Sequence, residues 1–241
     1  MNSPLDEPNL VQLDGFHALK HAIRFGATIV SAQTDRYSAT LQLAARLAPD
    51  CVPWLESNLL AVDSEALGSK ADRHPTRVLS FAQRPTTDMN ALAASKGAIV
   101  VLEDPRHLGN VGAAVRVAAG LSASALVTTG PIDPWAPESI RGGAGLQFAL
   151  PVIGGVELAD LDALRTSRPM LGLDPDGDSI FDLELPPNPM LCFGTERDGL
   201  SDELLQLCAQ RVSLPMRAGV SSLNLATSVS ATLLYFNARL R

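Results

Sequence analysis

The chain has 241 residues, of which 46% are hydrophobic and 19% are charged, and these proportions suit one large or two small globular domains. No apolar run reaches the roughly 18 residues of a membrane span, and the N-terminus lacks the charged start and apolar core of a signal peptide, so we expect a cytoplasmic protein with no membrane partner. The formal net charge of −7 argues against a general nucleic-acid binder.

The negative charge is concentrated in one part of the chain. Residues 133–203 contain 14 Asp/Glu and 4 Arg/Lys, a net charge of −10, whereas the rest contains 12 Asp/Glu and 15 Arg/Lys, a net charge of +3. RNA binding therefore requires local basic patches, because the overall field of the protein repels a polyanion.

The first 90 residues alternate between helical and strand patterns. We expect helices at residues 15–26 and 39–47 and strands at 28–32, 59–62 and 78–81. This order predicts a small αβ domain over residues 1–90, with a linker at 84–90 and a second domain over 91–241. His17 and His21 lie four residues apart on the first helix, but no third ligand follows, so we predict a surface pair and no metal site.

A strand, a turn and a helix of small residues follow the linker. Residues 99–102 are continuously apolar, which is typical of a parallel strand buried on both faces. Asn110 is a candidate cap for a helix over residues 111–119, where Arg116 is surrounded by Gly and Ala. Since no neighbour on that helix can pair with Arg116, its guanidinium either binds an external anion or extends to solvent.

The middle of the chain offers two further strand patterns and an acidic stretch. We expect strands at residues 125–128 and 169–173. Residues 174–182 are rich in Asp and turn-forming residues but lack the glutamate of a calcium loop, so we expect an exposed loop.

Residues 190–224 carry the densest turn and cap signals. A strand at residues 190–193 meets a turn between Gly194 and Gly199, and Ser201 is suited to cap a short helix at 204–208. A strand at 211–214, a loop at 219–224 and a final helix at 225–239 follow. Ligands of α/β folds lie beyond the carboxyl ends of strands. The pattern alone fits a ligand site and an ordinary αβ unit about equally. Cys51, Cys192 and Cys208 share no metal-like spacing, and the last two fit buried thiols.

Three ordered segments resemble the motifs of one family. GTERDGL, SLPM and SSLN, in residues 194–224, are similar to the second and third motifs of the SpoU-type (TrmH-like) RNA ribose methyltransferases of the SPOUT class. N-x-G-x-x-x-R, from Asn110 to Arg116, resembles the first motif. Two departures are visible: the stretch from Asp104 to Asn110 is longer than usual, and Gly143 replaces the usual Ser after Arg141.

The resemblance implies an α/β fold with a parallel sheet and a C-terminal trefoil knot, preceded by an RNA-substrate domain and dimerising through residues 91–241. It implies methyl transfer from S-adenosylmethionine to a ribose 2′-hydroxyl. The implied catalytic residues are Asn110, Arg116, Glu196, Ser222 and Asn224. The implied cofactor-binding residues are Leu173, Gly194, Glu196, Leu214, Met216, Ser222 and Leu223, and the candidate RNA-binding residues are Arg77, Arg84, Arg116 and Arg141.

Other functions remain open beside this interpretation. The N-terminal domain favours ribosomal RNA as the substrate, with transfer RNA as the alternative. A non-catalytic RNA-binding relative is a further possibility. Five retained residues argue for activity: Asn110, Arg116, Glu196, Ser222 and Asn224. A dinucleotide-dependent enzyme would need a G-x-G-x-x-G turn after an early strand, and the sequence contains no such run.

Overall fold

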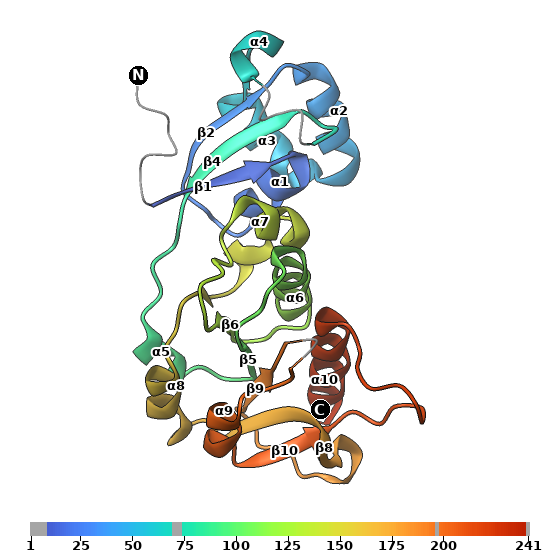
Figure 1. Cartoon of the computed structure of the whole chain (residues 1–241). Coiled ribbons are helices and arrows are strands. Elements are labelled where there is room, and N and C mark those ends of the chain that lie inside the picture. The colour runs from blue at the N-terminus through green and yellow to red at the C-terminus, as the bar shows by residue number, and fades with distance from the viewer. Residues whose placement is uncertain (1–8, 69–73, 196–197, 240–241) are drawn as a thin grey trace. The chain divides into compact units, whose positions relative to one another are not determined.

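The computed structural model describes residues 9–68, 74–195 and 198–239 (Figure 1). The contacts divide the chain into two compact units. The first comprises Met1–Thr86 together with Trp135–Ala149, and the second comprises Thr87–Pro134 and Leu150–Arg241. A short piece from the middle of the chain therefore packs with the N-terminal residues. The RNA-substrate role of residues 1–90 stays a prediction.

The N-terminal unit is built on a four-stranded mixed sheet in the order β1-β4-β2-β3. Its strands are β1 Leu10–Asp14, β2 Ile29–Thr34, β3 Leu60–Ala61 and β4 Val78–Gln83; its helices are α1 Phe16–Arg24, α2 Tyr37–Leu47, α3 Val52–Asn58, α4 Ser64–Leu67 and α7 Pro137–Gly143, with single turns η2 Pro49–Cys51 and η4 Leu146–Ala149. Phe16, Leu19 and Leu55 are fully buried in its core. The predicted helices and strands of this region are confirmed to within a few residues, but the pattern missed β1, α3, α4 and α7.

The C-terminal unit contains a six-stranded sheet in the order β10-β8-β9-β5-β6-β7, and every neighbouring pair is parallel. Its strands are β5 Ile99–Leu102, β6 Ala125–Thr128, β7 Val152–Ile153, β8 Met170–Ser179, β9 Met190–Phe193 and β10 Gln210–Ser213. Every residue of β5, β6 and β9 is buried. Their continuous apolar runs thus did predict central parallel strands.

Helices cover this sheet and connect its strands. They are α5 Met89–Ala93, α6 Leu108–Gly120, α8 Leu158–Arg165, α9 Asp202–Leu207 and α10 Leu225–Arg239, with the single turn η5 Ile180–Asp182. Helices α6 and α10 lie side by side (Figure 1). Ser201 caps α9 as predicted, because its hydroxyl accepts a hydrogen bond from the Leu204 N–H at 3.1 Å.

Two sequence predictions in this unit are wrong. Helix α6 begins at Leu108 and is preceded by His107, so Asn110 lies within the first turn instead of capping the helix. The N–H groups of Asn110 and Val111 both bond to the His107 carbonyl, which starts the helix early. The stretch at 174–182 is not simply a loop, since β8 continues to Ser179. Asp178 and Ser179 pair with Val212 and Ser213 of β10, and that pairing keeps the chain extended.

A buried arginine forms hydrogen bonds with the segments that precede the parallel strands. Arg168, two residues before β8, is fully buried. Its guanidinium donates to the carbonyl oxygens of Leu92, Ser95 and Gly97, which precede β5. It also donates to the Ser124 hydroxyl, just before β6, at 3.3 Å. Burial lowers the pKa of Arg168, and these oxygens replace the water that its charge has lost.

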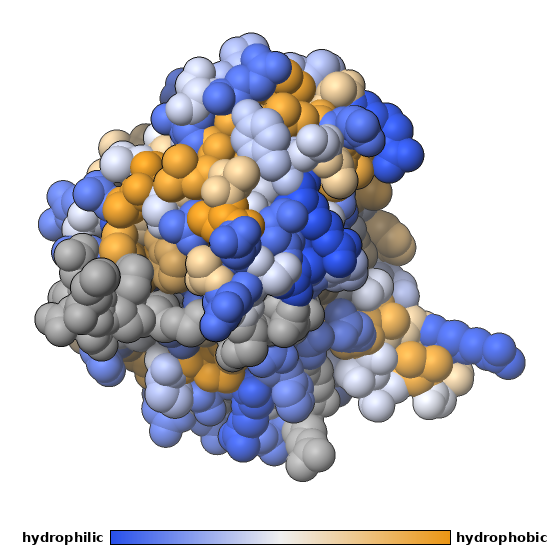
Figure 2. All heavy atoms as spheres, turned by 90° about the horizontal axis from the view of Figure 1, so that it is seen from above, coloured by the Kyte–Doolittle hydropathy of each residue, from blue (hydrophilic) through white to orange (hydrophobic). Residues whose placement is uncertain are grey.

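The exposed surface mixes hydrophobic and hydrophilic side chains. Figure 2 shows the two interspersed on the face seen from above. In the N-terminal unit the large exposed apolar residues are Phe25, Val30, Leu47 and Leu60. None of the helices in the described part of the chain combines the length and hydropathy needed to cross a membrane.

Candidate active site

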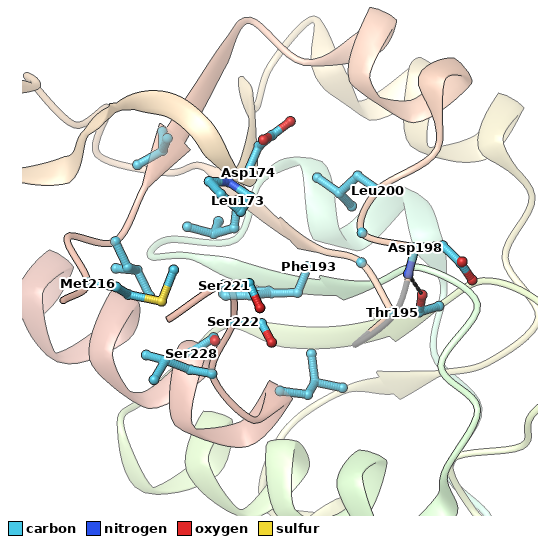
Figure 3. Close-up of a pocket in the computed structure, with 17 residues that line it drawn as sticks. Leu173, Asp174, Phe193, Thr195, Asp198, Leu200, Met216, Ser221, Ser222 and Ser228 are labelled. Atoms are coloured by element: carbon cyan, nitrogen blue, oxygen red, sulfur yellow. Dashed lines mark hydrogen bonds between the residues drawn. The ribbon is translucent and has the colours of Figure 1, made fainter. Parts of the chain in front are cut away.

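A pocket of about 360 Å³ lies at the carboxyl ends of β8, β9 and β10 (Figure 3). It is lined by Leu173, Asp174, Pro175, Phe193, Gly194, Thr195, Asp198, Gly199, Leu200, Val212, Leu214, Met216, Ser221, Ser222, Leu223, Leu225 and Ser228. These residues follow three strands whose carboxyl ends share one edge of the sheet, where ligands of parallel α/β folds bind. The volume falls within the roughly 300–1,000 Å³ that is usual for small-molecule sites.

A bulge in β8 forms one wall of the pocket. Leu171 and Gly172 pair with the first half of β10, but this pairing resumes only at Asp178, so residues 173–177 have no partner on β10, while Leu173 still pairs with Phe193 of β9. Gly177 closes the bulge: a Cβ there would lie 2.5 Å from backbone atoms of Arg211 and Val212. The bulge contains Asp174, which lines the pocket together with Leu173 at the start of the bulge.

The turn between Gly194 and Gly199 forms a second wall. The Thr195 N–H donates to the Gly199 carbonyl at 3.0 Å, and the Gly199 N–H donates to the Thr195 carbonyl at 3.1 Å. The Asp198 N–H also donates to the Thr195 hydroxyl at 3.0 Å, the dashed line in Figure 3. A Cβ on Gly194 would lie 2.0 Å from the Gly199 carbonyl carbon, so only glycine permits this close approach.

A buried carboxylate connects this turn to the end of β5. Glu103 directly follows β5 and is 8% exposed. It accepts a hydrogen bond from the Ser201 N–H at 2.7 Å and another from the Ser201 hydroxyl. Sequence reasoning did not select Glu103 as a site residue. An acidic residue placed immediately after a wholly apolar strand was the available signal.

The first and third motifs meet beside the pocket. The Asn224 side-chain amide donates to the Asn110 side-chain oxygen at 3.2 Å, across 114 positions of sequence. Asn224 also accepts from the Ala226 N–H at 3.0 Å and thereby caps α10. Ser222 lines the pocket two residues earlier (Figure 3). The structure thus brings Asn110, Asn224 and Ser222 into one region, although their catalytic roles stay predictions.

Six of the predicted cofactor-binding residues line this one pocket: Leu173, Gly194, Leu214, Met216, Ser222 and Leu223. The seventh, Glu196, lies outside the described residues. Sequence reasoning did not select Asp174, Thr195 or Asp198, which also line the pocket. Asp174 is placed there by the bulge of β8, which the sequence pattern did not reveal.

Arg116 lies on α6 and is exposed. It does not line the pocket, and it forms no ion pair within the described ranges. Arg116 follows Asn110 by six positions, which is about 9 Å along a helix axis. The guanidinium is therefore available to an external anion.

The other candidate RNA-binding arginines lie in the N-terminal unit and differ in their surroundings. Arg77 donates to Asp35 at 2.6 Å in a largely buried ion pair. Arg84 lies over the Trp135 ring, 5.8 Å from its centroid. Arg141, in the last turn of α7, is exposed. Arg77 thus has a structural partner, and Arg141 is the more accessible to phosphate.

One histidine of the pair on α1, His21, contacts the backbone after α7. The His21 ring Nδ1 lies 2.7 Å from the Ala144 carbonyl, and burial lowers the pKa of His21. Within the described ranges, no group of three or more His, Cys, Asp or Glu side chains is arranged to hold a metal ion.

Comparison with known proteins identifies the family. The sequence profile of the SpoU rRNA Methylase family matches residues 97–234, more than half of the chain. The chain belongs to this family. The matched stretch contains both walls of the pocket, the Asn110–Asn224 contact and Arg116.

Two curated relatives are named for their RNA substrates. The chain is 32% identical over 177 residues to the 23S rRNA (uridine(2479)-2′-O)-methyltransferase of Streptomyces viridochromogenes, covering 69% of this chain and 61% of that protein. It is 34% identical over 148 residues to the 23S rRNA (adenosine(1067)-2′-O)-methyltransferase of Streptomyces azureus, covering 59% and 55%. The match therefore spans less than two thirds of either relative.

A solved structure is similar over nearly the whole chain. The SpoU methyltransferase AviRb from Streptomyces viridochromogenes, in complex with the cofactor AdoMet, superposes with a TM-score of 0.78. The superposition covers 96% of this chain and 91% of that one at 24% identity. This similarity establishes the shared fold.

Proposed function

We propose that this protein transfers a methyl group from S-adenosylmethionine to a ribose 2′-hydroxyl of ribosomal RNA. The observation that carries the proposal is the pocket at the carboxyl ends of β8, β9 and β10, together with the Asn110–Asn224 contact at 3.2 Å. Membership of the SpoU family and the names of the two Streptomyces relatives support the same activity.

The pocket fits the cofactor chemically. Among the residues that the structure describes, its lining contains two carboxylates, Asp174 and Asp198, and no Lys, Arg or His. Such a lining disfavours a phosphorylated ligand and favours one with positive charge, as S-adenosylmethionine has on its sulfonium and amino groups. Leu173, Leu214 and Leu223 offer apolar surface for an adenine ring. When bound, the cofactor supplies the methyl group.

Residues of this chain hold the cofactor and orient the RNA. Leu173, Gly194, Glu196, Leu214, Met216, Ser222 and Leu223 are the proposed cofactor-binding residues, and Asn110, Arg116, Glu196, Ser222 and Asn224 are the proposed catalytic residues. Arg116 is a poor base because an arginine guanidinium stays protonated at neutral pH. We assign it to anchoring an RNA phosphate and assisting removal of the hydroxyl proton.

Arg77, Arg84 and Arg141 are proposed to contact RNA. The N-terminal unit, counted from the sequence, holds 9 Lys/Arg and 10 Asp/Glu, whereas the C-terminal unit holds 10 and 16. The net charges are thus −1 and −6. An approaching RNA is repelled less by the N-terminal unit, which supports a substrate-binding role for that part of the chain.

The proposed assembly is a homodimer through residues 91–241, with a C-terminal trefoil knot and a cytoplasmic location. Exposed apolar side chains on or near α10 support a contact surface there: Leu234 is 60% exposed and Phe181 59%, with Phe181 packed edge-on against Tyr235. Light scattering should give about twice the chain mass of 25.5 kDa. A monomer at micromolar concentration would contradict the dimer.

Two measurements test the activity. Calorimetry should detect S-adenosylmethionine binding, and labelled methyl groups should reach ribosomal RNA at a ribose 2′-hydroxyl.

Arg116→Ala should abolish methyl transfer but retain cofactor affinity and melting temperature. Arg116→Lys should also transfer methyl groups poorly because an ammonium lacks the planar fork of a guanidinium. Arg165→Ala, another exposed arginine, is the control. A folded Arg116→Ala protein with normal turnover would remove the proposed role of Arg116.

A further inference from the structure

Two cysteines lie close together beside Gly172 of β8. Cys192 is buried in β9, and Cys208 is half-buried at the carboxyl end of α9. Gly172 of β8 is the register partner of Cys192, so the two positions direct their side chains to the same face of the sheet. A Cβ on Gly172 would lie 3.0 Å from the Cys208 sulfur. The Cys208 sulfur therefore occupies the space that glycine leaves open beside Cys192.

The two thiols interact with each other. A hydrogen bond between them lowers the pKa of Cys208 and raises the pKa of Cys192, and burial raises the latter further. Glu103 raises both pKa values, whereas Arg211 lowers that of Cys208. Burial also raises the pKa of Cys208, and its thiol donates to the Leu204 carbonyl at 3.3 Å. Cys208 is the partly exposed member of the pair and Cys192 the fully buried one, so a small oxidant reaches Cys208 first.

Cys51 provides an internal comparison. It is fully buried in the N-terminal unit, and burial raises its pKa. The Cys51 thiol donates to the Lys20 carbonyl at 3.7 Å. The hydrophobic cluster that contains Cys51 includes neither Cys192 nor Cys208. A small oxidant should distinguish Cys51 from the pair.

We infer that Cys192 and Cys208 form a redox-active dithiol, a modification site whose substrate is a small hydroperoxide. The Cys208 thiolate attacks one peroxide oxygen, the O–O bond breaks, and the other oxygen leaves as water or an alcohol after taking a proton. Cys208 is then a sulfenic acid. The Cys192 sulfur attacks the Cys208 sulfur, a disulfide forms, and the hydroxyl group leaves as water with the Cys192 proton. The two thiols lose two electrons, which reduce the peroxide.

The disulfide would close a ring through a wall of the pocket. The chain from Cys192 to Cys208 includes the turn between Gly194 and Gly199 and the pocket-lining Leu200. A Leu200 methyl carbon lies 3.1 Å from the same Gly172 Cβ position that the Cys208 sulfur approaches. Moving that sulfur toward Cys192 vacates part of this space, so Leu200 should shift and the amide exchange of residues 198–208 should change.

The experiment treats the reduced full-length protein with hydrogen peroxide, alkylates the remaining thiols after denaturation, and maps peptides by mass spectrometry. The expected result is a Cys192–Cys208 disulfide that forms at least tenfold faster than Cys51 oxidises. Cys51→Ser should match the unmodified protein. Cys192→Ser should accumulate sulfenic acid at Cys208, detected with dimedone, and Cys208→Ser should leave Cys192 reduced.

Hydrogen exchange on the oxidised and reduced protein then reports on residues 198–208 without requiring any ligand. Two outcomes overturn the inference: oxidation of Cys51 as fast as the pair, or reduced Cys192 and Cys208 after Cys51 has reacted. Circular dichroism of each serine variant confirms folding, and dimedone labelling of the unmodified chain tests the site even where a variant unfolds. The result is independent of methyltransferase activity.

Discussion

The two ends of the parallel sheet are built in opposite ways. At the amino ends, the buried Arg168 donates to oxygens that precede β5 and β6, and the Asn188 side chain, before β9, accepts from the Gly97 N–H at 2.8 Å. At the carboxyl ends, glycine turns and a strand bulge leave a pocket of about 360 Å³.

The amino ends of this sheet contribute mainly to stability, and its carboxyl ends form the candidate functional site. At the amino ends, the terminal nitrogens of the buried Arg168 are held by oxygens of neighbouring segments. The carboxyl ends direct backbone groups and loop side chains into a cavity, which is where parallel α/β folds place their chemistry. Substitutions at the amino ends should therefore cost the most stability, and those that line the pocket at the carboxyl ends should mainly change binding.

The largest effect is expected at Arg168. Arg168→Ala leaves several buried carbonyl oxygens without a donor and creates a cavity, so the free energy of unfolding should fall by about 3–5 kcal/mol. Arg165→Ala is the matched control, since Arg165 is exposed and its ion pair is with Asp162 of its own helix. Urea unfolding measures both. Equal losses in the two variants would break the proposed distinction between the ends.

The next largest effect is expected at Gly194. Gly194→Ala places a methyl group against the Gly199 backbone and must displace the turn. Affinity for S-adenosylmethionine should fall at least 100-fold, about 2.7 kcal/mol, with a smaller loss of stability than in Arg168→Ala. Gly109→Ala is the control, because a Cβ there meets no atom within 4 Å. If calorimetry shows that the Gly194 variant binds S-adenosylmethionine with normal affinity, the turn does not shape the cofactor site.

A smaller effect is expected at Glu103, the buried carboxylate that accepts hydrogen bonds from Ser201 at the carboxyl ends of the strands. Glu103→Gln keeps the shape but replaces one of the two acceptors used by Ser201, so unfolding should become easier by about 1–3 kcal/mol. Glu203→Gln, at an exposed position of α9, should change it by only a few tenths. Chemical unfolding of both variants supplies the measurement. If the Glu103 variant were as stable as the control, the hydrogen bonds to Ser201 would contribute little.

The smallest effect is expected from the contact between Asn110 and Asn224. A double-mutant cycle with alanine at both positions should give a coupling of about 0.5–1 kcal/mol in the free energy of unfolding. Asn224→Ala should cost more than Asn110→Ala, by about 1 kcal/mol, since only Asn224 caps α10. Additive single effects would show that the 3.2 Å contact joins the two motifs without stabilising them.

Much of the C-terminal unit could be predicted from local pattern. The buried runs of β5, β6 and β9 and the Ser201 cap were all predicted, because apolar continuity and capping chemistry act over a few residues. The start of α6 and the course of β8 were not. Each depends on a partner that local propensity does not report: the His107 carbonyl for α6, and β10 for Asp178 and Ser179.

The sequence by itself determined the family motifs, the central strands and six of the seventeen described residues that line the pocket. Tertiary structure alone decided that Trp135–Ala149 packs with the N-terminal unit, that Arg168 closes one end of the sheet, and that Glu103 holds Ser201 across 98 positions. The physical reason is the range of the interactions. Periodicity and caps are encoded by neighbours in sequence, whereas a buried charge is stabilised only by groups that folding brings to it from distant segments.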